Sequence, residues 1–143
     1  MNFSDIKKLL DQKVNQYNCS RFIDDDPVQI PHLFSKKEDI EIAGFLSSLL
    51  AWGQRKTIIA NARRLMDMMD NTPHSFVMNA GKKDISQFIK FVHRTFNGDD
   101  CVFVISSLQN IYRNHGGLQN VFDTGYQKND DLKSAILHFR KIF

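Results

Sequence analysis

The sequence predicts an all-α protein, a single-domain bundle of about seven or eight helices around one buried central helix. Apolar residues recur at spacings of three and four, and no useful length of chain alternates with period two. Only seven Gly and three Pro interrupt the 143 residues, which favours helices joined by short connections. The segment 40–52, IEIAGFLSSLLAW, is apolar around most of a helical wheel, which is typical of a buried helix.

The ends of this central helix are predicted by its flanking residues. Ser35 and Glu38 have the spacing of a capping box, so we expect the helix to begin just after them. Gly53 provides a stop, which makes Trp52 the last residue of a buried helix. Gly44 costs roughly 1 kcal/mol of helix propensity, so we expect its missing side chain to let a neighbouring helix come close.

The N-terminal part of the chain contains one amphipathic helix and one loop. The periodicity predicts a helix over 3–18 with Ser4 as its N-cap. The segment 19–34 is predicted to be an ordered loop, because Pro27 and Pro31 each remove a hydrogen-bond donor and bias the preceding residue away from helix.

After the central helix, apolar periodicity and capping residues predict the remaining elements in order. Thr72 and Pro73 are an N-cap followed by Pro at the first helical position. Asp130 is the predicted cap of the last helix. The expected helical segments are 57–70, 73–80, 84–92, 100–115, 118–124 and 132–143.

Composition excludes several classes of protein. The chain is 42% hydrophobic and 24% charged, which is ordinary for a globular domain and unlike a disordered or fibrous one. Its apolar runs are far shorter than the ~18 residues that span a bilayer, and its start lacks a signal-peptide pattern. Cys19 and Cys101 are too few and too scattered for a disulfide framework. We therefore predict a cytoplasmic protein with reduced thiols and no membrane partner.

The positive charge of the chain is concentrated in one stretch. Between Ile42 and Met66 there is no acidic residue. This stretch carries a charge of +4, against +3 for the whole chain, from Arg55, Lys56, Arg63 and Arg64. The start of a helix favours anions, so Gly53 to Arg64 is a candidate for binding nucleic-acid phosphates. A solvated basic face with no ligand is the alternative reading of the same residues.

Other polar groups give weaker signals. Asp24, Asp25 and Asp26 are adjacent, which suits a capped turn better than a cation site. Asp39 and Glu41 lie near the start of the central helix. Three roles are open for them: a favourable interaction with the helix dipole, an ion pair with a buried Arg, or catalysis. No His or Cys has zinc-ligand spacing, and no Gly-rich phosphate loop or nucleophile elbow is present. We expect no metal, no cofactor and no catalytic residue in this chain.

A set of residues spread from the loop to the end of the central helix forms a specific pattern: Asp26, Pro27, Pro31, Asp39, Glu41, Gly44, Phe45, Trp52, Gly53 and Arg55. Through this pattern the stretch from Arg21 to about Phe122 resembles an uncharacterised family of bacterial conserved hypothetical proteins, domain of unknown function 2400. Members of that family continue into a second half with a Pro-x-Asp-x-His motif, which this sequence lacks. The sequence ends in apolar Ile142 and Phe143, so we expect it to be the N-terminal part of a longer protein.

More distantly, the layout is similar to the N-terminal half of the helix-hairpin-helix DNA glycosylases. In those enzymes a buried helix ends in a Leu-Ser-x-Gln-x-Thr segment, whose Gln enters the duplex at the lesion; residues 50–55 take that place here. The resemblance implies a DNA partner, with Gln54 as the lesion probe. The Gly-rich hairpin that introduces the glycosylase catalytic residues is absent after residue 122, so the resemblance implies no catalysis by this chain alone.

Two functions follow as predictions. The first is the nucleic-acid-binding helical portion of a DNA-repair protein of the base-excision type, with Gln54, Arg55, Lys56, Arg63 and Arg64 facing the DNA. The alternative is a helical protein–protein interaction module or structural subunit without catalytic activity. In that reading the last helix docks a missing C-terminal half or another copy through Phe139, Ile142 and Phe143.

Overall fold

A computed structural model describes residues 2–143 and has nine α-helices and three 3-10 helices in that range, with no strand beyond an isolated bridge between His93 and Phe96. The all-α prediction is confirmed. The additional elements lie in the segment that was predicted to be a loop: α2 (Ser20–Asp24), η1 (Pro27–Gln29) and η2 (Pro31–Leu33). The turns η1 and η2 each begin at a Pro, a position where the missing N–H is not needed.

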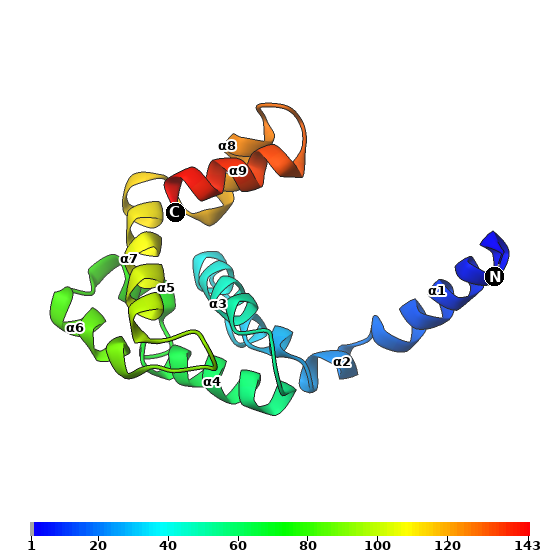
Figure 1. Cartoon of the computed structure of the whole chain (residues 1–143), viewed down its shortest axis with the longest axis horizontal. Coiled ribbons are helices and arrows are strands. Elements are labelled where there is room, and N and C mark those ends of the chain that lie inside the picture. The colour runs from blue at the N-terminus through cyan, green and yellow to red at the C-terminus, as the bar shows by residue number, and fades with distance from the viewer. Residues whose placement is uncertain (1) are drawn as a thin grey trace.

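Helix α3 (Lys37–Leu49) is the central element, as predicted, and Figure 1 shows it between the other helices. Its inner face buries Ile42, Ala43 and Leu46. The predicted bounds were wrong, because the helix begins at Lys37 without a side-chain cap and ends before Trp52.

The end of α3 also exposes Trp52. The Trp52 N–H donates to the carbonyl of Leu50 at 2.7 Å, and Gly53 has a φ of 117°, so the chain turns away from the helix axis here. The Trp52 side chain is 40% exposed, which contradicts the prediction that it is buried. The indole therefore lies at the surface, beside the start of the next helix.

Two helices pack directly on α3: α4 (Arg55–Asp67) and α5 (Pro73–Asn79). Helix α7 (Gly98–Asn114) packs on α5, and its Tyr112 hydroxyl donates to Glu41 of α3. Two short elements, α6 (Lys82–Ser86) and η3 (Gln87–Lys90), lie against α7. Helix α7 has a capping box, because the Asn97 side chain accepts from the backbone of Asp100 while the Asp100 side chain accepts from that of Asn97. The fully buried large side chains of this body include Leu65, Met66, Met69, Phe88, Phe91, Ile105, Leu108 and Ile111.

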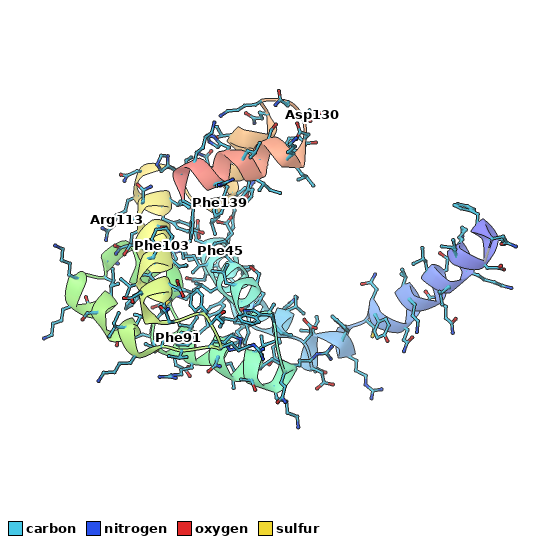
Figure 2. All side chains as sticks on the ribbon, viewed as in Figure 1. Phe45, Phe91, Phe103, Arg113, Asp130 and Phe139 are labelled. Carbon is cyan, nitrogen blue, oxygen red and sulfur yellow. The ribbon has the colours of Figure 1, made fainter. Side chains whose placement is uncertain are left out.

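The last two helices form a hairpin, α8 (Leu118–Tyr126) and α9 (Leu132–Ile142). The cap of α9 is Asp131, one residue later than the predicted Asp130, because the Asp131 carboxylate accepts from the N–H of Ser134. Stacked and edge-to-face aromatic contacts join the hairpin to α3 and α7 (Figure 2). The rings in this cluster are Phe45, Phe103, Phe122, Phe139 and Phe143.

Helix α1 (Phe3–Tyr17) projects away from the helical body (Figure 1). It is amphipathic as predicted, but every residue in it is exposed, including the apolar stripe from Phe3 to Tyr17. Its cap is Asn2 and not Ser4, because the Asn2 side chain and Asp5 form a capping box. None of the helices within residues 2–143 is long and apolar enough to cross a membrane.

The glycines differ in how closely their neighbours approach. A Cβ added to Gly98 would lie 1.9 Å from the carbonyl oxygen of Ile89, so the start of α7 packs directly on the η3 backbone. A Cβ at Gly44 would lie 3.8 Å from Pro31, which is ordinary contact. The close neighbour of Gly44 is thus a 3-10 turn that leaves room for a methyl group, and not the tightly packed helix that we expected.

We predict opposite effects from adding a methyl group at these two glycines. Gly98→Ala should destabilise the fold by more than about 3 kcal/mol, because backbone must move to admit the Cβ. Gly44→Ala should stabilise it by about 0.5–1 kcal/mol, because the position is helical and has room. Urea unfolding followed by circular dichroism measures both, and equal stability of the two variants would contradict the packing described.

The two thiols should differ in reactivity. Burial, with a smaller contribution from the neighbouring Asp100, raises the pKa of the Cys101 thiol to about 12, so it stays protonated at pH 8. Cys19 is exposed. Because the thiolate is the nucleophile, iodoacetamide at pH 8 should modify Cys19 alone in the folded protein and both cysteines in urea. Peptide mass mapping gives the result, and rapid modification of Cys101 in the folded state would contradict it.

Candidate nucleic-acid interface

The start of α4 brings three of the predicted residues together. Gln54 is the N-cap, and its side chain makes no capping hydrogen bond. Arg55 and Lys56 are the first two residues of the helix, and both are exposed. Within residues 2–143, the backbone N–H groups of 55–57 have no protein partner. The positive end of the helix dipole and two side-chain cations therefore face solvent at one place.

The other two predicted cations lie further along α4 and make contacts of their own. Arg63 follows Lys56 by two turns on the same face, and its guanidinium donates to the side-chain oxygen of Gln29. The Arg64 guanidinium lies over the ring of Phe91, 5.6 Å from its centroid. The structure thus places Arg55 and Lys56 at the helix start and holds Arg63 and Arg64 against other elements.

None of these four cations is neutralised by a close carboxylate. The ion pairs within 4.0 Å in residues 2–143 are Lys7 with Asp11 and Lys37 with Glu41. A shallow groove beside α4 is nevertheless lined by Asp24 and Asp25 as well as by Arg55, Lys56 and Arg63. The groove is therefore mixed in charge, whereas the turn before α4 carries the more purely positive surface.

Sequence reasoning missed a further cation at this turn. The Arg94 guanidinium stacks on the exposed indole of Trp52, 4.6 Å from the ring centroid. It also lies close to Gly53, where an added Cβ would be 3.1 Å from the Arg94 Cδ. Arg94 has a left-handed backbone, with a φ of 58°. No local pattern links it to Trp52, because the two residues are far apart in the sequence.

A buried histidine holds the turn before α4 in place. His93 is 2% exposed, and its Nδ1 lies 2.8 Å from the side-chain nitrogen of Asn61. Because the Asn61 amide donates, Nδ1 accepts, and the Nε2 hydrogen is free to donate to the Trp52 carbonyl at 3.3 Å. His93 also makes an edge-to-face contact with the Trp52 ring. This histidine therefore fixes the position of residues 52–56, which we call the basic turn.

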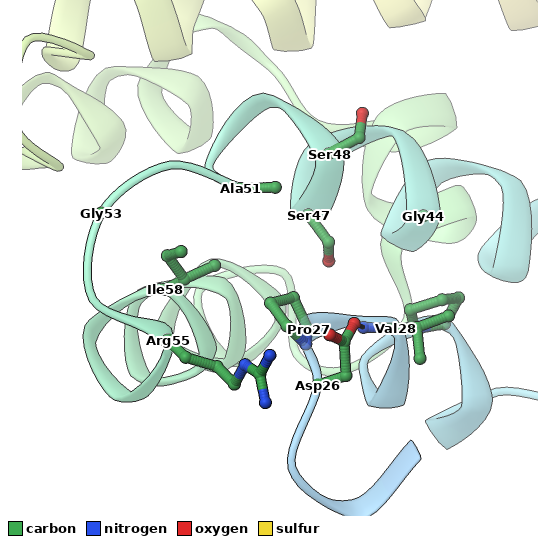
Figure 3. Close-up of a pocket in the computed structure, with 11 residues that line it drawn as sticks. Asp26, Pro27, Val28, Gly44, Ser47, Ser48, Ala51, Gly53, Arg55 and Ile58 are labelled. Carbon is green, nitrogen blue, oxygen red and sulfur yellow. Dashed lines mark hydrogen bonds between the residues drawn. The ribbon is translucent and has the colours of Figure 1, made fainter. Parts of the chain in front are cut away.

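Next to the turn is a hollow of about 410 Å³ between η1, α3 and the start of α4 (Figure 3). Ser47 of α3 lies at its floor, and Asp26 and Arg55 lie on its rim. Much of its wall is apolar, from Pro27, Val28, Pro31, Ala51 and Ile58. The hollow shares Gly53 and Arg55 with the basic turn, so the two features are continuous.

The remaining acidic candidates have structural partners. Asp26 caps η1, because its Oδ1 accepts from the Val28 N–H at 3.0 Å, which confirms a capping role in the Asp24–Asp26 turn. Asp39 accepts from the backbone N–H of His74 at 2.8 Å and so caps α5 from another helix. Glu41 accepts from the hydroxyl of Tyr112 at 2.8 Å, and no arginine within residues 2–143 pairs with it.

Within residues 2–143, no group of three His, Cys, Asp or Glu side chains is arranged to hold a metal ion.

Comparison with known proteins identifies the chain by family. No curated protein and no solved structure matches it, so the likeness to DNA glycosylases stays a prediction. Residues 26–143 match a family described as protein of unknown function (DUF2400). The matched region starts at the cap of η1 and contains the hollow and the basic turn. Because the match covers most of its length, the chain belongs to the DUF2400 family.

Proposed function

We propose that this chain is the nucleic-acid-binding helical portion of a DNA-repair protein of the base-excision, glycosylase-like type, and that it binds DNA through the start of α4. The observation that carries the proposal is the exposed helix start, where Arg55 and Lys56 accompany backbone donors that have no partner among residues 2–143. Helix starts of this kind bind phosphate groups, which positions a protein on nucleic acid without reading its sequence.

The surroundings of the helix start support a nucleic-acid ligand over a simple anion. Arg94 adds a positive charge, and the exposed Trp52 ring adds a flat surface of the kind on which bases stack. Arg63 and Arg64 extend the positive charge along α4, although each already contacts a neighbouring element. In this proposal Gln54, which is uncharged and uses no side-chain capping bond, is the probe at the lesion.

The proposal predicts a specific change in the salt dependence of DNA binding. Wild-type protein should bind duplex DNA at low salt, with an affinity that falls as salt is raised. Replacing both Arg55 and Lys56 by Ala should reduce the slope of log affinity against log salt by about 2, because two phosphate contacts are lost. Gln54→Ala should leave that slope unchanged and reduce the preference for duplex that contains an abasic site.

Fluorescence anisotropy with labelled duplexes measures these quantities. The matched control replaces Lys82 and Lys83 by Ala, since both are exposed and α6 lies across the helical body from the start of α4 (Figure 1). This control should retain the wild-type slope. Absence of binding at low salt, or the same loss in both double variants, would reject the proposal.

A helical interaction module is the second candidate function, and the exposed face of α9 favours it. The aromatic residues that we expected to dock a partner pack instead on this chain, since Phe139 and Phe143 contact Phe45. Other apolar residues of α9 remain at the surface, with Leu132 73% and Ile136 59% exposed. This face is available to a further part of the protein or to a second copy.

Self-association through α9 has its own test. Sedimentation equilibrium at increasing concentration should show wild-type chains forming oligomers, because association removes Leu132 and Ile136 from water. The variant with both residues changed to Ser should stay monomeric. Val92→Ser, which alters a 56% exposed apolar residue outside α9, should behave as wild type. A wild-type protein that is monodisperse and monomeric at every concentration would count against this function.

A further inference from the structure

The hollow beside α4 has an unpaired polar group at its floor. Ser47 is 4% exposed, and its Oγ has no hydrogen-bond partner within residues 2–143. Buried hydroxyl groups in folded proteins nearly always have a partner. Ser107, another buried serine of this chain, donates to the Phe143 carbonyl at 3.1 Å. The Ser47 hydroxyl instead points from α3 toward Asp26 and Pro27, across the hollow (Figure 3).

The rim of the hollow adds two further groups that are free to bind a ligand. One carboxylate oxygen of Asp26 accepts from the Val28 N–H, and the other has no partner in the part of the chain that the structure describes. Figure 3 shows the Arg55 guanidinium on the same side as this carboxylate, and no ion pair within 4.0 Å joins them. A hydroxyl, an acceptor and a cation thus surround an apolar chamber.

These groups specify the chemistry of a ligand. The hollow of about 410 Å³ is within the usual range of small-molecule sites, and its apolar wall suits a flat or hydrophobic group. The free Asp26 oxygen requires a donor, and the Ser47 hydroxyl takes either a donor or an acceptor. Arg55 favours an anion at the rim, where the start of α4 lies. A nucleotide combines these features, because its base has donor and acceptor edges and its phosphate is an anion.

We propose that the hollow receives the base of one nucleotide, with Ser47 and Asp26 at the hydrogen-bonding edge of the base and Arg55 at its phosphate. The inference rests on the proposed function, since Arg55 belongs to both the DNA-binding helix start and the rim of the hollow. A nucleic-acid strand whose phosphate lies on the start of α4 would have an unstacked base beside the hollow, because Arg55 belongs to both. Single unstacked bases are recognised in this way, by packing and by contacts to their edges.

The experiment titrates the full chain with each of the four deoxynucleoside monophosphates and follows methyl groups by NMR. Shifts should occur at the methyl groups of Val28, Ala51 and Ile58, which line the hollow. The methyl groups of Leu118 and Val121, which belong to α8, should not move. These reporters locate the ligand without any need for DNA.

A matched pair of serine variants tests the floor of the hollow. Ser47→Ala should weaken nucleotide binding about fivefold, because one hydrogen bond is lost. It should leave the melting temperature unchanged or raise it, because an unpaired buried hydroxyl is removed. Ser106→Ala should bind as wild type, because Ser106 lies on α7 outside the hollow, is exposed, and donates its hydroxyl to the Val102 carbonyl at 2.8 Å. A structural role for Ser47 would instead lower the melting temperature.

The outcomes separate this inference from the proposed function. Unmoved Val28, Ala51 and Ile58 methyl groups at millimolar nucleotide, or wild-type affinity in Ser47→Ala, would overturn the inference, even if DNA bound with the expected salt dependence. Shifts confined to the hollow and weakened by Ser47→Ala would support it. That result together with no DNA binding at low salt would reject the DNA-binding function and retain a site for free nucleotides.

Discussion

The burial of α3 is the constraint on which the rest of this structure depends. Its apolar residues cover most of the helix surface, so other elements must cover it on several sides. The helices α4, α5 and α8 and the turns η1 and η2 do so, and the aromatic cluster around Phe45 closes the end near α9. Beside Ser47 the covering leaves a space, where a small polar residue of α3 meets the turns η1 and η2. The hollow is therefore a consequence of how the central helix is packed.

The order of the helices was predictable because it depends on local patterns, whereas the ends of α3 and the composition of the site were not. Apolar periodicity gives α1, α7 and α9 directly, since each has one apolar stripe. Trp52 misled the prediction because an apolar residue beside a helix reads as part of it, while the turn at Gly53 and the contacts with His93 and Arg94 place it at the surface. Those contacts join residues about 40 positions apart, and a single sequence carries no signal for them.

The candidate site shows the same division between local and distant information. Gln54, Arg55 and Lys56 are consecutive, so their position at a helix start followed from the sequence alone. The hollow combines residues from η1, the middle of α3 and the first turns of α4, and Ser47 appeared in the sequence only as a polar interruption of an apolar helix. Its significance depends on the absence of a hydrogen-bond partner in the described part of the chain, which is a property of the folded protein.

Charge decides which part of α4 is suited to a phosphate. Asp24 and Asp25 share a groove with Arg55, Lys56 and Arg63, and at physiological salt charges interact over about 8 Å. A phosphate in that groove would meet carboxylates as well as cations, so the net attraction there is small. On the side of the turn that faces Trp52, Arg94 adds to Arg55 and Lys56, and the free backbone donors point to solvent. In the proposed function, a strand on this side keeps its phosphates away from Asp24 and Asp25, and the hollow adjoins it through Gly53 and Arg55. The proposal thus assigns the backbone and the base of one strand to neighbouring parts of a single surface.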